Sequence, residues 1–100
     1  MFKLDEHPLV VQRAIIKVYG FVQGVGFRAN AKRLALRLGL KGYAKNNDDC
    51  SVEIVVEGHE DKIKELIEFC KNGPKLAKVS KVDIKFEMAK NEFDGFGIRF

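Results

Sequence analysis

The segment best suited to chemistry is a glycine-rich stretch that ends in an arginine. Three glycines fall within seven positions, in the segment Gly20-Phe21-Val22-Gln23-Gly24-Val25-Gly26-Phe27-Arg28. Glycines let a backbone turn sharply and direct successive N–H groups at one point, and a following helix N-terminus adds partial positive charge. The segment therefore predicts an anion-binding loop, although its spacing is also compatible with a tight strand-to-helix connection.

Arg28 is the residue that favours a bound anion. It falls in the first turn of the expected helix, where the helix dipole disfavours a cation by roughly 0.3–1 kcal/mol. A phosphate held jointly by loop amides and the guanidinium would offset this effect. The alternative is a solvated residue beside Lys32, Arg33 and Arg37. The segment has neither the Gly-Lys-Ser/Thr ending of a Walker A loop nor the dinucleotide-binding order Gly-x-Gly-x-x-Gly.

Apolar periodicity predicts the elements that must position this loop. Alternation indicates strands over residues 13–19, 42–47, 52–57 and 81–87, and an apolar patch at 96–100 is a candidate C-terminal edge strand. Helical spacing indicates one helix between Phe27 and Gly39 and a second that ends at Gly73. The order predicts an α+β, ferredoxin-like βαββαβ sandwich, with two helices on one face of an antiparallel sheet.

Length and composition narrow the class of protein. One hundred residues make one domain, which we assign to residues 13–100, with residues 1–12 as an N-terminal tail or extension. No stretch approaches the ~18 apolar residues needed to cross a membrane, so we expect a cytoplasmic protein without membrane contact. The net charge of +4 indicates an anionic partner without identifying it.

The remaining chemistry-bearing residues predict no metal or cofactor site. Cys50 and Cys70 match no metal-ligand spacing, and the expected topology holds them too far apart for a disulfide. We expect Cys70 in the core and Cys50 in a turn. His7 and His59 are expected at the surface, and Asp48-Asp49 are expected to form a turn.

Two ordered motifs resemble the signatures of the acylphosphatase family. The loop and its arginine resemble the first signature, Gly-x-Val-Gln-Gly-Val-x-Phe-Arg. Gly42-Tyr43-Ala44-Lys45-Asn46, with Val52 and Gly58 at the family's intervals, resembles the second. The resemblance covers residues 13–100. It implies a metal-independent enzyme that hydrolyses the carboxyl–phosphate bond of small-molecule acyl phosphates by direct attack of water, with inorganic phosphate as product and inhibitor. We expect it to act as a monomer.

The resemblance also implies roles for individual residues. Arg28 binds the phosphate and Asn46 positions the attacking water. The backbone amides of the loop complete the phosphate cradle, with the loop residues being Gln23, Gly24, Val25, Gly26, Phe27 and Arg28. The family usually has glycine at the position of Cys50. If that position needs a positive φ, a cysteine costs on the order of 1 kcal/mol, which predicts a weaker hairpin rather than lost activity.

The absence of a nucleophile or dyad in the sequence fits such a substrate. A carboxylate leaving group with a pKa near ~4 needs no general acid to expel it. Positioning and charge stabilisation then supply most of the catalysis. An alkyl phosphate monoester, which has a worse leaving group, is expected to be a poor substrate.

Three alternatives share this fold class. The first is an RNA-recognition motif, but Lys41-Gly42-Tyr43-Ala44 only begins like its aromatic strand signature and then departs from it. The second is the acylphosphatase-like module of hydrogenase-maturation carbamoyltransferases, which are longer chains with zinc-type cysteine pairs. The third, a ferredoxin-like metal chaperone, would need a cysteine pair on the first loop.

Overall fold

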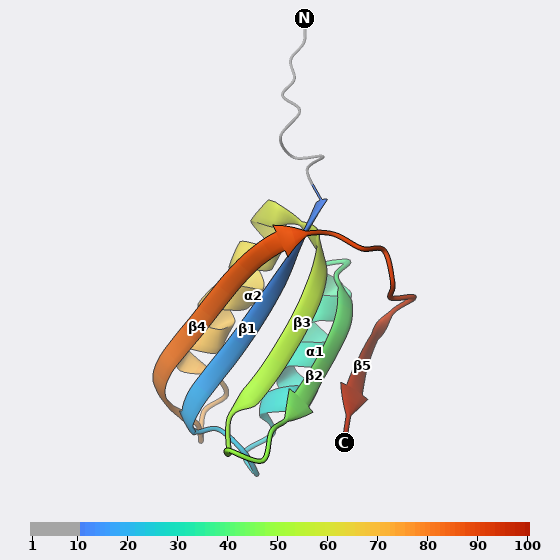
Figure 1. The fold of residues 1–100 in the computed structure, drawn as a ribbon. Coiled ribbons are helices and arrows are strands. Elements are labelled where there is room, and N and C mark those ends of the chain that lie inside the picture. The colour runs from blue at the N-terminus through green and yellow to red at the C-terminus, as the bar shows by residue number, and fades with distance from the viewer. Residues whose placement is uncertain (1–10) are drawn as a thin grey trace, which may run out of the picture.

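The computed structural model describes residues 11–100 as a five-stranded sheet with both helices on one face (Figure 1). The elements in chain order are β1 (Val11–Phe21), α1 (Phe27–Arg37), β2 (Lys41–Asn46), β3 (Val52–His59), α2 (Glu60–Asn72), β4 (Lys78–Met88) and β5 (Phe96–Arg99). The expected ferredoxin-like α+β fold is confirmed, including the C-terminal edge strand. None of the helices in this part of the chain is long and apolar enough to cross a membrane.

The four strands of the βαββαβ unit form an antiparallel sheet, as expected, and the added edge strand makes the whole sheet mixed. Its strand order is β4-β1-β3-β2-β5, and the first four strands pair antiparallel. β5 instead runs parallel to β2, with Gly42 opposite Phe96 and Lys45 opposite Arg99. The reason lies in the connection after β4, which crosses the end of the sheet where β2 begins and brings β5 down beside β2 (Figure 1).

β1 is longer at both ends than the alternation indicated. It begins at Val11, so Val11 and Gln12 belong to the strand, while the rest of the expected tail, residues 1–10, lies outside the described residues. It also includes Gly20 and Phe21, the first two residues of the glycine-rich segment. The register with β4 shifts between Tyr19 and Gly20. Gly20 has φ 127°, and a Cβ there would lie 2.2 Å from a backbone oxygen, so this irregularity requires glycine.

The core lies between the sheet and the helices, as the one-sided alternation predicted. Its fully buried members include Ile16, Ile54, Phe27, Ile63 and Leu66, which come from two strands and both helices. Both cysteines are free: Cys70 is buried in this core, and Cys50 is exposed in the turn after β2, as expected. Burial raises the pKa of the Cys70 thiol to about 12, so this side chain stays protonated and serves as packing.

Candidate active site

The glycine-rich loop presents unpaired backbone amides at the start of α1. Gly24 and Gly26 have φ 76° and 79°, in the left-handed region that glycine adopts without strain. Gly26 is the N-cap of α1, with no side-chain cap and no acidic residue in the first turn. Within residues 11–100, no protein group accepts a hydrogen bond from the backbone N–H groups of residues 23–28. A concave set of free amides at a helix N-terminus is suited to an anion.

Arg28 extends from this helix start toward the end of β5. Its Nη1 atom donates a hydrogen bond to the backbone oxygen of Arg99 over 3.1 Å. The guanidinium carbon also lies 4.8 Å from the centre of the Phe100 ring. Because a guanidinium carries five N–H donors, this contact leaves others for a ligand. The sequence alone did not indicate that the C-terminal strand holds Arg28.

Asn46 shares one cavity with Arg28. β1 and β2 both run antiparallel to β3, so the loop after β1 and the last residue of β2 meet at the same end of the sheet. The cavity measures about 170 Å³ and is lined by Val22, Gly24, Gly26, Phe27, Arg28, Ala29, Asn46, Ile98 and Phe100. Asn46 is half-buried, and its side-chain amide has no hydrogen-bond partner in the described part of the chain.

Two residues of the predicted loop face away from this cavity. The side-chain amide of Gln23 donates to the backbone oxygens of Asn47 and Ser51, over 2.9 and 3.0 Å. It therefore ties the loop to the turn after Asn46. Val25 packs against the hydrophobic core. Gly24, Gly26, Phe27 and Arg28 do line the cavity, although the Phe27 side chain is itself buried, with its ring tilted by 58° against that of Phe69.

The turn between β2 and β3 is stabilised by the Asp49 carboxylate. Its Oδ1 accepts hydrogen bonds from the backbone N–H and the hydroxyl of Ser51, and its Oδ2 lies 3.2 Å from Lys17 Nζ. These contacts, the Ser51 hydroxyl first, lower the pKa of Asp49 to about 2. The expectation that this acidic residue forms the turn is confirmed. Cys50, next in sequence, has φ 73°, so the position does adopt the left-handed conformation.

The sequence did not indicate that residues 98–100 belong to the candidate site. Ile98 and Phe100 line the cavity, and Arg99 supplies the oxygen that binds Arg28. Their alternation with Phe96 did indicate a common face. It gave no sign of which strand they would join, and only the parallel pairing with β2 brings them to the end of Asn46's strand.

A larger cavity, about 450 Å³, lies at the opposite end of the sheet beside Lys41, His59 and Asp94. The buried carboxylate on its wall, Glu57, already binds Arg13 Nη1 and the backbone N–H groups of Lys90 and Asn91. The smaller cavity instead combines free amides, a guanidinium and a free carboxamide. We therefore assign the chemistry to the smaller cavity.

Comparison with known proteins identifies the family of this chain. The sequence model of the acylphosphatase family matches residues 14–98. This chain belongs to the acylphosphatase family. An acylphosphatase of Aeropyrum pernix is 48% identical over 89 residues, which cover 88% of each chain. The crystal structure of acylphosphatase from Bacillus subtilis superimposes with a TM-score of 0.83 at 36% identity, covering 91% of this chain and 100% of the other.

Family membership makes this protein a hydrolase, and it favours that class over a nucleic-acid-binding module. A similar domain occurs inside a much longer protein, full-length HypF in its phosphate- and nucleotide-bound form. There the TM-score is 0.83 and the identity 32%, over 91% of this chain but 12% of the other. Acylphosphatase-like domains are thus found both as whole small proteins and as modules.

Proposed function

We propose that this acylphosphatase hydrolyses the carboxyl–phosphate bond of acyl phosphates by direct attack of water, with the phosphate held by Arg28 and the loop amides. One observation carries the proposal: free backbone amides, the Arg28 guanidinium and the unpaired Asn46 carboxamide line the same cavity. An acyl phosphate needs an anion cradle and a positioned water, and this cavity offers groups for both.

Phosphate binding would draw on three sources of positive potential. The N–H groups of residues 23–28 lack protein acceptors within the described chain, and the dipole of α1 adds to them. Arg28 contributes charge-assisted hydrogen bonds through the donors that Arg99 does not use. Without an anion, Arg28 stands at the unfavourable end of the helix dipole. A bound phosphate dianion turns that repulsion into a joint attraction.

Asn46 would hold the attacking water in line with the phosphorus–oxygen bond that breaks. A carboxamide both donates and accepts hydrogen bonds, so it can orient a water molecule without repelling the phosphate, as a carboxylate would. None of the side chains lining the cavity is a base. We therefore propose that the proton of the attacking water passes to a phosphate oxygen of the substrate. The bond from phosphorus to the acyl oxygen breaks with both electrons on the leaving carboxylate.

The decisive experiment compares steady-state hydrolysis of benzoyl phosphate with that of p-nitrophenyl phosphate. We expect turnover of the first and little of the second, because only the first releases a carboxylate. Arg28→Ala and Asn46→Ala should each lower kcat/KM for benzoyl phosphate by at least about 10²-fold, the scale seen when a preorganised transition-state contact is removed. A chelator should leave the rate unchanged. Equal turnover of both substrates, or a large loss with the chelator, would refute the proposal.

The two assigned roles can be separated by inhibition with inorganic phosphate. Arg28→Ala should weaken this inhibition strongly, because it removes a phosphate ligand. Asn46→Ala should weaken it less, because Asn46 would contact only the phosphate oxygen that comes from the attacking water. Arg37→Ala is the matched control, since Arg37 is an exposed arginine in the last turn of the same helix. Either active-site variant keeping most of its activity would contradict the role given to that residue.

We also propose that the protein is a monomer and that it acts on small-molecule substrates in the cytoplasm. Sedimentation equilibrium on the active enzyme tests the monomer. A mass twice that of one 11.3 kDa chain would contradict it.

A further inference from the structure

We propose that Arg99 and Tyr43, on the sheet face opposite the helices, are positioning residues of the active site: together they fix β5, and β5 holds the Arg28 guanidinium. The inference rests on the proposed function in one respect, namely that Arg28 binds the phosphate. It concerns side chains outside the catalytic cavity.

Arg28 depends on β5 for the support of its guanidinium. Arg28 Nη1 donates to the backbone oxygen of Arg99 over 3.1 Å, and the guanidinium lies over the Phe100 ring. Among residues 11–100, these are the only hydrogen bond and the only cation–π contact of its guanidinium, and they come from Arg99 and Phe100. An arginine without such support would sample many rotamers, and a ligand would have to select the useful one.

β5 itself needs support. It is a strand of four residues at the edge of the sheet, paired on one side only, with β2. Phe96 anchors its start in the core and is 6% exposed. Its other end, which touches Arg28, has no such anchor, because Arg99 and Phe100 are both exposed. Strand ends of this kind fray unless side chains hold them.

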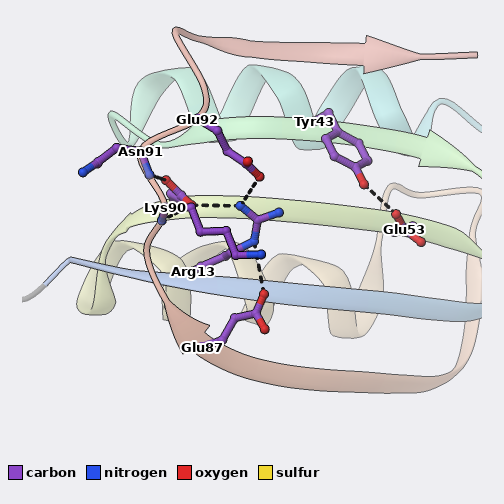
Figure 2. Close-up of polar contacts among 8 residues, drawn as sticks. Arg13, Tyr43, Glu53, Glu87, Lys90, Asn91 and Glu92 are labelled. Atoms are coloured by element: carbon purple, nitrogen blue, oxygen red, sulfur yellow. Dashed lines mark hydrogen bonds and ion pairs between the residues drawn. The ribbon is translucent and has the colours of Figure 1, made fainter.

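A contact between Arg99 and Tyr43 holds this end of β5. The Arg99 guanidinium carbon lies 3.8 Å from the centre of the Tyr43 ring, within the range of a cation–π interaction. Tyr43 is on β2, and its hydroxyl donates to Glu53 Oε2 on β3 over 2.7 Å (Figure 2). The ring is therefore fixed at its hydroxyl end by the neighbouring strand and provides a rigid surface for Arg99.

The connection that leads into β5 is fixed by the same face of the sheet. The Phe93 ring packs edge-on against Tyr43, with 6.0 Å between ring centroids, and the Arg13 guanidinium lies 5.3 Å from the Phe93 centroid. Arg13 is paired in turn with Glu87 and Glu92 (Figure 2). It is also paired with Glu57. A continuous set of contacts thus runs from β1 across the outer face to Tyr43, Arg99 and the backbone oxygen that binds Arg28.

The predicted kinetic signature follows from this arrangement. Replacing the Arg99 side chain does not remove its backbone oxygen. Only the fraction of time that this oxygen spends in contact with Arg28 changes. If phosphate binds only when Arg28 is supported, the apparent affinity for phosphate falls in proportion to the fraction of molecules in which Arg28 is supported. The enzyme saturated with substrate keeps its kcat. For an exposed cation–π contact the expected change is about two- to fivefold.

The main test measures KM for benzoyl phosphate and inhibition by inorganic phosphate. Arg99→Ala should raise KM and the phosphate inhibition constant by the same two- to fivefold factor with kcat unchanged, and Arg99→Lys should recover part of the loss. Tyr43→Leu should raise both constants at least as much, whereas Tyr43→Phe keeps the ring, loses only its hydroxyl contact and should raise them less than Tyr43→Leu. Unchanged KM in Arg99→Ala, or a fall in kcat alone, would overturn the proposal.

Two controls separate positioning from loss of charge and from unfolding. Lys45 lies on β2 directly opposite Arg99. Lys45→Ala removes a positive charge at this position and should leave KM unchanged. An equal rise in that variant would mean that only long-range charge is involved. In a double-mutant cycle, Arg99→Ala should have no further effect on phosphate binding once Arg28 is alanine. Additive losses would overturn the inference.

The failure of this inference differs from a failure of the proposed function. If the wild-type protein does not hydrolyse benzoyl phosphate, the proposed function fails. The positioning role is then decided by calorimetric titration of the same variants with inorganic phosphate. If hydrolysis and the Arg28 effect are found but Arg99→Ala binds phosphate like wild type, only the positioning role fails. Urea midpoints for each variant confirm that the assays are made on folded protein.

Discussion

The side-chain amide of Gln23 lies 2.9 Å from the backbone oxygen of Asn47 and thereby links the two halves of the candidate active site. Gln23 belongs to the loop before Arg28, and Asn47 directly follows Asn46. A second hydrogen bond from the same amide reaches the backbone oxygen of Ser51 over 3.0 Å. The separation between the proposed phosphate loop and Asn46 therefore depends on a side chain that does not line the cavity.

Replacing this amide should affect catalysis as well as stability. Gln23→Met keeps the length of the side chain but removes both donors, and each lost hydrogen bond is worth about 0.5–1.5 kcal/mol. We expect urea unfolding to show a loss of about 1–3 kcal/mol and kcat/KM for benzoyl phosphate to fall about tenfold. Gln12→Met on β1 is the control, since no hydrogen bond of its side chain joins it to the described residues. Normal kcat/KM in a destabilised Gln23→Met would show that the link is only structural.

Cys50 occupies a backbone conformation that disfavours its side chain. With φ 73° it lies in the left-handed region, where an L-residue with a Cβ is strained by about 1–2 kcal/mol. Cys50→Gly should therefore raise the free energy of unfolding by about 1 kcal/mol, after allowing for the greater freedom of glycine in the unfolded chain. Cys50→Ala should change it little, because the strained Cβ remains. Equal unfolding free energies for the glycine and alanine variants would exclude this explanation.

Local patterns in the sequence were sufficient for the fold, and they singled out two residues, Arg28 and Asn46, that share the candidate cavity. Alternation with one apolar face predicted which side of the sheet the helices cover. Left-handed glycines at positions 24, 26 and 39 allow the turns that the pattern indicated. Arg28 and Asn46 were identified through the two motifs, and the topology brings them to one cavity because β1 and β2 end on the same side of the molecule.

The parts that the sequence did not reveal depend on contacts between distant segments. Nothing local specifies that β5 pairs parallel with β2, so the link from Arg99 to Arg28 could not be foreseen. The Gln23 side chain could equally have met a ligand or a backbone oxygen, and only the position of the β2–β3 turn decides between them. The buried cluster around Arg13 joins residues 44 to 79 positions apart and leaves no periodic signal.

The Arg13 cluster should dominate the stability of the outer face. Burial disfavours the charged form of Glu57, yet the backbone N–H of Lys90 and the Arg13 guanidinium hold the pKa of that carboxyl below its usual value. Arg13→Met leaves this buried carboxylate without its cation, which should cost about 3–5 kcal/mol in urea unfolding. Glu92→Gln alters a half-exposed partner of the same arginine and should cost less than about 1 kcal/mol. Similar losses in both variants would contradict a special role for the buried pair.

Stability should also fall in acid through Asp49. The hydroxyl and backbone N–H of Ser51, together with Lys17, lower the pKa of this carboxyl from 3.8 to about 2 in the folded protein. Because the folded pKa is the lower one, the carboxylate's contribution is complete above about pH 4 and is lost as the pH falls through about 2.

Urea unfolding of wild type and Asp49→Asn between pH 6 and 2 measures this contribution. The difference in unfolding free energy between the two proteins should be constant above about pH 4 and shrink as the pH approaches about 2. Asp48→Asn, at the adjacent exposed position, makes none of these contacts and should follow wild type throughout. A wild-type advantage over Asp49→Asn that persists undiminished to pH 2 would mean that the turn does not depend on the charge of Asp49.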